Sequence, residues 1–271
     1  MPIRDNGGTK VWQRRDRAAQ FRIWLTWLVV TAAFMASWAV IHEQTIWFFV
    51  LDAPTQALDM ASRMVPPRWS YFERIVDPLW DTINIATLGT LLGIAIATPI
   101  AFLAAHNTTP SRAFVRPVAL LVIVASRSIN SLIWALLLVL ILGPGLLAGI
   151  IAIALRSIGF IGKLLYEAIE EIDPAQVESI EATGASRAQV IAYGIAPQVM
   201  PAFAGISVYR WDINIREATV LGLVGAGGIG IQLQASVNNL AWNQVTVIFL
   251  AILATVVVSE WVSAKVRHAI I

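Results

Sequence analysis

Long segments with few or no charged residues dominate this sequence. An α-helix of about 20 apolar residues crosses the ~30 Å hydrocarbon core of a bilayer. Only 13% of the residues are charged, whereas soluble domains carry about 25%. The sequence therefore predicts an all-α polytopic membrane protein and excludes a soluble globular one. Its six expected transmembrane helices span residues 23–41, 82–105, 117–142, 145–166, 201–224 and 240–264.

Basic residues are distributed unevenly around these segments. Twelve Lys and Arg residues fall in the parts that a six-helix arrangement places inside, against three in the outer loop 42–81, which also carries six acidic residues. The positive-inside rule thus predicts a cytoplasmic N-terminal segment 1–22 and a cytoplasmic C-terminus 265–271. The run 23–41 is too long for a signal peptide, so we expect a retained first helix.

The outer loop 42–81 contains four prolines, which we expect to break any long helix. Aromatic residues favour the headgroup level of a membrane, so short interfacial helices are predicted around those of this loop. A simple connector is the alternative. The prolines are Pro54, Pro66, Pro67 and Pro78, and the aromatic residues are Trp47, Phe48, Trp69, Tyr71 and Phe72.

The polar segment 173–197 has the pattern of a cytoplasmic helix hairpin. Asp173 is a good N-cap before Pro174, and Gly184 can adopt the positive φ that ends a helix. A capping box follows, and a proline then limits the second helix. These later residues are Ser186, Gln189 and Pro197. Two exposed helices, each tied to a membrane span, predict a docking element.

This hairpin resembles the coupling loop of ABC importer permeases. Glu178, Gly184 and Pro197 have the family's spacing, whereas the motif's two alanines and its Ile and Leu are replaced by Ser179, Ile180, Gly194 and Ala196. In that family the loop sits in a groove of the ATP-hydrolysing subunit. The resemblance implies that ATPase coupling involves Glu178, Glu181, Ala182, Gly184, Ala185, Ser186 and Pro197.

The resemblance extends over residues 66–267, and in this region the sequence is similar to permeases of the phosphonate importer group. It implies a type I importer permease fold with a core permease domain, 82–264, in the bacterial cytoplasmic membrane. Implied partners are a second copy of the chain, two ATPase subunits that bind ATP and magnesium, an external phosphonate- or phosphate-binding protein, and membrane lipid. One departure is Asn130, where related permeases usually carry a proline that bends the third span.

Four arginines lie within predicted spans, where a charged group costs at least ~2.5–3.5 kcal/mol and is expected to face protein or water. At 100° per residue, Arg210, Asn214 and Glu217 share one helix face, and Asp212 and Arg216 form an i,i+4 ion pair on the other. A basic excess suits a small oxyanion. The predicted substrate path comprises Arg127, Asn130, Arg156, Arg210, Asn214 and Glu217, although mutual neutralisation of the charges is an alternative.

Other motifs are discounted. Residues 225–230 satisfy G-x-G-x-x-G, but they follow a membrane helix rather than a strand, so a glycine-rich turn is expected instead. The chain has no phosphate-binding loop, no cysteine and three scattered histidines, so we expect no enzyme active site and no metal site. A net charge of +2 does not favour nucleic acid. Permeases for another small anion or an amino acid, and a secondary transporter, stay open.

Overall fold

The computed structural model describes residues 3–12 and 17–270, which are almost entirely helical. Arg14 and Arg15, counted above among the cytoplasmic basic residues, lie outside this range. Five described helices are long and apolar enough to cross a membrane, and a sixth span results if one bent pair is counted as a single crossing. The all-α polytopic prediction is confirmed. Two compact units, Met1–Met60 and Ala61–Ile271, are described separately.

The first unit begins with a short hairpin, in which β1 (Ile3–Asn6) pairs antiparallel with β2 (Thr9–Trp12). Helix α1 (Arg17–Gln44) contains the predicted first span, and none of its apolar window is buried. Helix α2 (Trp47–Met64) continues through Pro54. The prediction that this proline ends a helix is wrong, because proline removes one backbone donor while the flanking residues keep theirs.

After the end of α2, the second unit continues through a break at Pro66–Pro67 and the 3₁₀ turn η1 (Trp69–Tyr71), which leads into α3 (Phe72–Ala104). Helix α3 is longer than the predicted second span, because it begins before Pro78 and contains that residue. The outer loop is therefore mostly helical, with its break confined to the two adjacent prolines. The prediction of several short helices there is wrong.

The predicted third span, 117–142, is broken in two. Helices α4 (Val115–Ser128) and α5 (Ser131–Leu142) meet at an angle of 88°. Asn130 caps α5, because its side-chain oxygen accepts a hydrogen bond from the Leu132 amide at 3.1 Å. The asparagine thus starts a second helix by capping its N-terminus, and the segment 117–142 is not one continuous helix.

The hairpin prediction is confirmed for its first helix and corrected for its second. Gly184 has a φ of +82° and ends the turn after α7, as expected. The second arm does not stop at Pro197, which lies in the first turn of α9, where a missing amide hydrogen costs nothing. The elements in order are α6 (Leu146–Glu170), α7 (Pro174–Glu181), α8 (Arg187–Gln189), the π-helical η2 (Val190–Ile195) and α9 (Ala196–Leu221).

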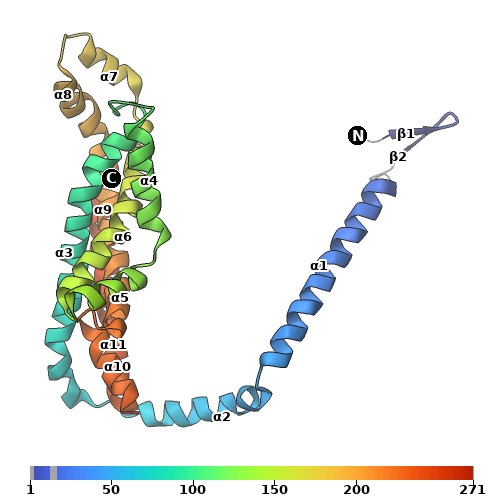
Figure 1. Cartoon of the computed structure of the whole chain (residues 1–271), viewed down its shortest axis with the longest axis vertical. Helices are drawn as coiled ribbons and strands as arrows, with labels where there is room; N and C mark the ends of the chain where they lie inside the picture. The colour runs from blue at the N-terminus through green and yellow to red at the C-terminus, as the bar shows by residue number, and fades with distance from the viewer. Residues whose placement is uncertain (1–2, 13–16, 271) are drawn as a thin grey trace. The chain divides into compact units, whose positions relative to one another are not determined.

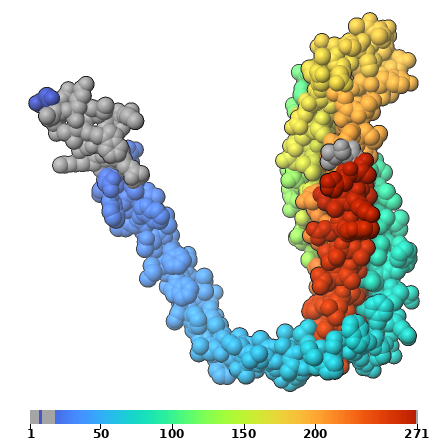
Figure 2. Space-filling model, turned by 180° about the vertical axis from the view of Figure 1, so that it is seen from behind, coloured from blue at the N-terminus to red at the C-terminus, as the bar shows by residue number. Residues whose placement is uncertain are grey.

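A glycine-rich turn follows α9, as predicted. The 3₁₀ turn η3 (Gly222–Val224) leads to three glycines with positive φ, Gly225, Gly227 and Gly228. Helix α10 (Ile229–Asn238), which the sequence analysis missed, precedes α11 (Trp242–Ile270). Helix α11 covers one face of the unit beside α3 (Figure 2). Its C-terminal end points toward the hairpin end of the unit (Figure 1); a cytoplasmic position for both stays a prediction.

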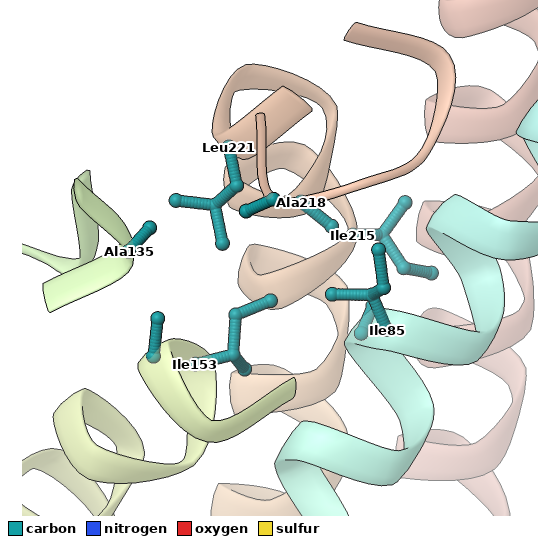
Figure 3. Packing of buried hydrophobic residues seen from close by; sticks show 9 residues of the cluster. Ile85, Ala135, Ile153, Ile215, Ala218 and Leu221 are labelled. Atoms are coloured by element: carbon teal, nitrogen blue, oxygen red, sulfur yellow. The ribbon is translucent and has the colours of Figure 1, made fainter. Parts of the chain in front are cut away.

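Small residues bring α3 and α6 together. A Cβ on Gly89 would lie 2.7 Å from the Ile153 side chain, and one on Gly93 would lie 2.7 Å from Ser157 Cβ. Such close approach is how helices pack in a bilayer, where the hydrophobic effect between helices is weak. The core around this contact joins α3, α5, α6 and α9 through Ile85, Ala135, Ile153, Ile215, Ala218 and Leu221 (Figure 3).

The glycine-rich turn supplies a test of the packing. A Cβ on Gly222 would lie 2.5 Å from the Gly230 Cα, so Gly222→Ala is expected to lower the free energy of unfolding by about 1–3 kcal/mol through overpacking. Gly205→Ala on α9 is the control, because its Cβ would meet nothing within 4 Å. Thermal unfolding of the purified protein measures both changes, and equal melting temperatures for the two variants would contradict the packing described.

Candidate functional site

A buried polar cluster joins α3, α6 and α9 at the point where the glycines bring the first two helices together. Asn214 Nδ2 donates to Thr90 Oγ1 at 2.7 Å and to Ser157 Oγ at 3.0 Å. Arg210 Nε donates to the same serine hydroxyl at 3.1 Å. All four side chains are buried. Because unpaired polar groups are costly in such surroundings, these bonds fix the rotation of α9 against its neighbours.

The carboxylate of Glu217 connects this cluster to a more exposed arginine. Its Oε2 lies 3.4 Å from Arg210 Nη2, and its Oε1 lies 3.3 Å from Arg156 Nε. Arg210 also lies over the Phe160 ring, 5.1 Å from the centroid. The Arg210 side chain is 2% exposed, whereas that of Arg156 is 29% exposed. Arg156 is thus the member of this triad that can meet a small ion.

A third arginine stands beside the same turn of α6. A Cβ on Gly159 would lie 2.5 Å from Arg127 Cγ, so only a glycine lets the α4 arginine lie across α6 at this level. Among the described residues Arg127 has no ion pair or hydrogen bond, and it is exposed. Arg127 thus lies beside the turn of α6 that follows Arg156, and Arg156 and Arg210 share the carboxylate of Glu217. Together, the three arginines and the one carboxylate carry a net charge of +2.

Ser126 fastens α4 to α6 at this level. Its hydroxyl donates to the Leu155 carbonyl and accepts from the Gly159 amide, the latter at 2.8 Å. In an α-helix that amide and that carbonyl are partners in the backbone ladder, so the serine hydroxyl bonds to both ends of one ladder step while α6 stays a continuous α-helix. This places Arg127 close to the turn that carries Arg156.

The Asp212 face of α9 has a different set of contacts. Asp212 Oδ2 lies 2.8 Å from Arg216 Nη2, and Asp212 Oδ1 accepts from Ser259 Oγ at 2.7 Å. A second carboxylate, Glu260, lies 3.9 Å from Arg216. These contacts hold α11 against α9 and leave this arginine neutralised. They agree with a structural pair, but its role stays a prediction.

The structure brings together most of the residues predicted for the substrate path, but not Asn130, which caps α5. Thr90, Ser126, Ser157 and Phe160 also belong to this cluster and were not predicted. A signal existed for Ser157, which directly follows Arg156, and for Thr90, which lies between the two glycines of the Gly89-x-x-x-Gly93 pattern. No sequence signal marks Ser126 as a contact of α6.

The hairpin forms a second candidate surface at the opposite end of α6 from its N-terminus (Figure 1). Asp173 caps α7 through a 3.0 Å bond from the Ala175 amide, and the Ser186 amide donates to Gln189 at 2.8 Å in a capping box. Most residues predicted for coupling are exposed, with Ala185 half-buried. A cleft of about 820 Å³ beside them is lined by acidic Glu178 and Glu181 and by several apolar side chains.

The model of the family described as "binding-protein-dependent transport system inner membrane component" matches residues 97–265, more than half of the chain. The chain belongs to this family. It is a multi-pass protein of the bacterial inner membrane and a permease subunit of a binding-protein-dependent ABC importer. Membership in this family speaks against a secondary transporter. The family comprises the membrane component of the transport system and not its ATP-hydrolysing subunit.

Relatives and solved structures agree with this membership. The chain is 39% identical to the phosphite transport system permease protein PtxC of Stutzerimonas stutzeri, over 82% of each chain. It is 37% identical to the phosphate-import permease protein PhnE of Mycolicibacterium smegmatis, over 89% of this chain and 44% of that one. A structure of the inward-facing MetNI methionine ABC transporter matches with a TM-score of 0.63 at 18% identity, over 73% of this chain and 96% of that one.

The two arginines held by Glu217 are expected to differ in what they stabilise. Arg210→Gln leaves a mostly buried carboxylate with one cation and removes one of the two donors to the Ser157 hydroxyl, so we expect a loss of about 1.5–3 kcal/mol. Arg156→Gln leaves Glu217 paired with Arg210 and is expected to change stability little. Thermal unfolding in detergent compares them, and equal destabilisation would show that Arg210 is not the structural member of the triad.

Proposed function

We propose that this chain is the permease through which an ABC importer moves a phosphorus oxyanion, namely phosphite, phosphonate or phosphate, into the cell. The single observation that carries the proposal is the local charge of the site, where Arg156 and Arg210 share one carboxylate and the exposed Arg127 lies beside the same part of α6. Guanidinium stays charged at any working pH and presents paired donors that match phosphonyl oxygens. The names of the relatives, which refer to phosphite and phosphate, support the same substrate class.

The two more accessible arginines of the site, Arg127 and Arg156, would meet the ion. Arg127 is unpaired within the described residues, and Arg156 shares its carboxylate with a second arginine, so each retains attraction for an anion. Arg210 would act mainly by holding Glu217, and Asn214 by fixing α9. Partial neutralisation also has a use, because an ion bound too tightly would not be released.

A methionine-type or other amino-acid substrate is the second candidate. The observation in its favour is a 23% identity to the probable D-methionine permease MetI of Vibrio cholerae, over 66% of this chain. An amino acid is a zwitterion, however, and its ammonium group would be repelled by a site of net positive charge. We therefore favour the oxyanion.

The energy source in this proposal is a separate ATPase that binds ATP and magnesium and docks on the hairpin. The capped, exposed α7 and α8 support this partner, and the sequence carries no phosphate-binding loop of its own. An external binding protein would deliver the ion. We also propose a two-fold homodimer, which would duplicate the arginines around one axis and is the commonest closed assembly. Membrane lipid would surround the dimer.

Uptake into proteoliposomes tests the substrate and the site together. The complex of this chain with its ATPase and binding protein should import phosphite, phosphonate or inorganic phosphate in preference to sulfate or methionine. Arg127→Gln and Arg156→Gln should each lower uptake about tenfold, which corresponds to ~1.4 kcal/mol of lost attraction. Arg112→Gln is the control, since within the described part of the chain its side chain bonds only to the His106 carbonyl of its own loop.

Normal uptake in both site variants would contradict the assignment of the anion path. Methionine import without import of any phosphorus oxyanion would favour the second candidate. A native mass measurement of the same preparation counts the copies of this chain, and one copy in a transporting complex would contradict the homodimer.

The positive φ of Gly184 tests the docking of the ATPase. Gly184→Ala must hold a Cβ in the left-handed region, at a cost of about 1–2 kcal/mol, and is expected to loosen the turn between α7 and α8. Gly194→Ala is the matched control on the same hairpin, because its Cβ would make only ordinary contacts at 3.5 Å or more. We expect less ATPase subunit to co-purify with the first variant than with the second. Equal recovery would argue against docking at this turn.

A further inference from the structure

An arginine of the hairpin reaches a loop that belongs to two other helices. The Nη2 atom of Arg187, in α8, donates to the carbonyl of Thr108 at 2.6 Å and to that of Thr109 at 3.1 Å. A terminal guanidinium nitrogen carries two N–H groups, so one nitrogen satisfies two successive carbonyls. Hydrogen bonds from a charged donor are stronger than neutral ones. The hairpin is therefore bonded to the loop between α3 and α4.

That loop is itself bound to the ends of three helices. Arg116, in the first turn of α4, donates to the Ala104 carbonyl at the end of α3 at 3.0 Å and pairs with Glu170 at 3.2 Å. Glu170 ends α6 and also accepts from the His106 amide at 2.7 Å. Asn107 donates to the Ile169 carbonyl at 2.6 Å. A displacement of this loop would therefore reach α3 and α4 together.

Apart from the bonds of Arg187, the hairpin makes few contacts that could move α3 and α4. Its backbone continues into α6 on one side and, through η2, into α9 on the other. Among the described residues, no other side chain of segment 174–189 makes a hydrogen bond or ion pair outside the hairpin. Val177 adds apolar contact with the cluster around Ala101 and Ala105. Apolar contact resists sliding less than a directional bond does, so the arginine is the main tie to the loop.

We propose that Arg187 is a positioning residue that makes the loop between α3 and α4 follow the hairpin when the ATPase moves it. The proposal rests on the proposed function, because it needs an ATPase on the hairpin. Helix α4 carries Arg127 in its last turn, and α6 carries Arg156. With the bond intact, movement of the hairpin reaches Arg127 through the loop and α4, and it reaches Arg156 through α6. Without it, the movement enters through α6 and α9, and among the described residues the loop is left with its bonds to Ile169 and Glu170 at the end of α6.

The test compares Arg187→Ala with Arg187→Lys and with Arg112→Ala in the assembled complex. Because the chain has no cysteine, Ala113→Cys and Ala188→Cys place spin labels only on the loop and on α8. Their distance is measured without nucleotide and with ATP and vanadate. In the same proteoliposomes, ATP hydrolysed per ion imported is measured with phosphite and with inorganic phosphate as probes.

We expect the label distance to stay constant through the cycle in the wild type and in Arg112→Ala, and to change in Arg187→Ala. ATP hydrolysed per ion imported should rise about threefold or more in Arg187→Ala, and less in Arg187→Lys, which keeps a cation but not the planar fork. The ATPase should still co-purify with all variants.

Two results would overturn the proposal. One is an Arg187→Ala complex with an unchanged label distance and an unchanged ATP requirement. The other is loss of the ATPase from that complex, which would make Arg187 a docking contact rather than a positioning residue. If the wild-type complex imports neither probe, the proposed substrate fails, but the label distances do not depend on the ion and still decide the role of Arg187.

Discussion

The packing of α6 against α9 depends on two ion pairs that share the carboxylate of Glu217. This carboxylate lies between Arg156 and Arg210, and no other carboxylate among the described residues pairs with either. Burial of an unpaired guanidinium is expensive, so this one acid lets α6 and α9 approach each other while both carry cations. The hydroxyls of Ser157 and Thr90, which accept hydrogen bonds from Arg210 and Asn214, complete this contact between the helices. Helix packing and the charge of the site are thus settled by the same few atoms.

The glycines have the complementary role of setting distances. Gly89 and Gly93 let α3 approach α6, and Gly159 lets α4 approach it from another side. Helix α6 therefore lies at the centre of the unit, with half of its apolar window buried, more than in any other described span. Its C-terminal end leads into the hairpin, and it carries Arg156 along its length. In the proposed importer, this position would let α6 transmit movement from the hairpin to the arginines.

The sequence predicted those features that depend on local chemistry. Hydrophobic length located the spans, and Asp173, Gly184 and the Ser186–Gln189 box located the hairpin, because caps and positive φ act within a few residues. Prolines misled the prediction at Pro54, Pro78 and Pro197, since one missing donor does not decide where a helix ends when its neighbours favour it. The break at Asn130 was missed because asparagine caps only when its side chain turns back to the backbone.

The candidate site was predicted in part for the same reason. Helical periodicity placed Arg210, Asn214 and Glu217 on one face, because that relation lies within one helix. The partners on other helices, Thr90, Ser157 and Ser126, depend on which faces meet, and periodicity in a single sequence does not contain this information. The relative exposure of Arg156 and Arg210 also follows from tertiary packing alone.

The two hydrogen bonds that the Ser126 hydroxyl makes with the backbone of α6 have a mechanical consequence. A straight helix that bends must stretch a bond between an amide and the carbonyl one turn before it, and in a bilayer no water replaces that bond. Here a side chain from α4 already serves both the Leu155 carbonyl and the Gly159 amide. If α6 bends at this turn, which lies at the level of Arg156, both groups keep Ser126 as a partner, so the bend would cost less here than at a turn without such a side chain.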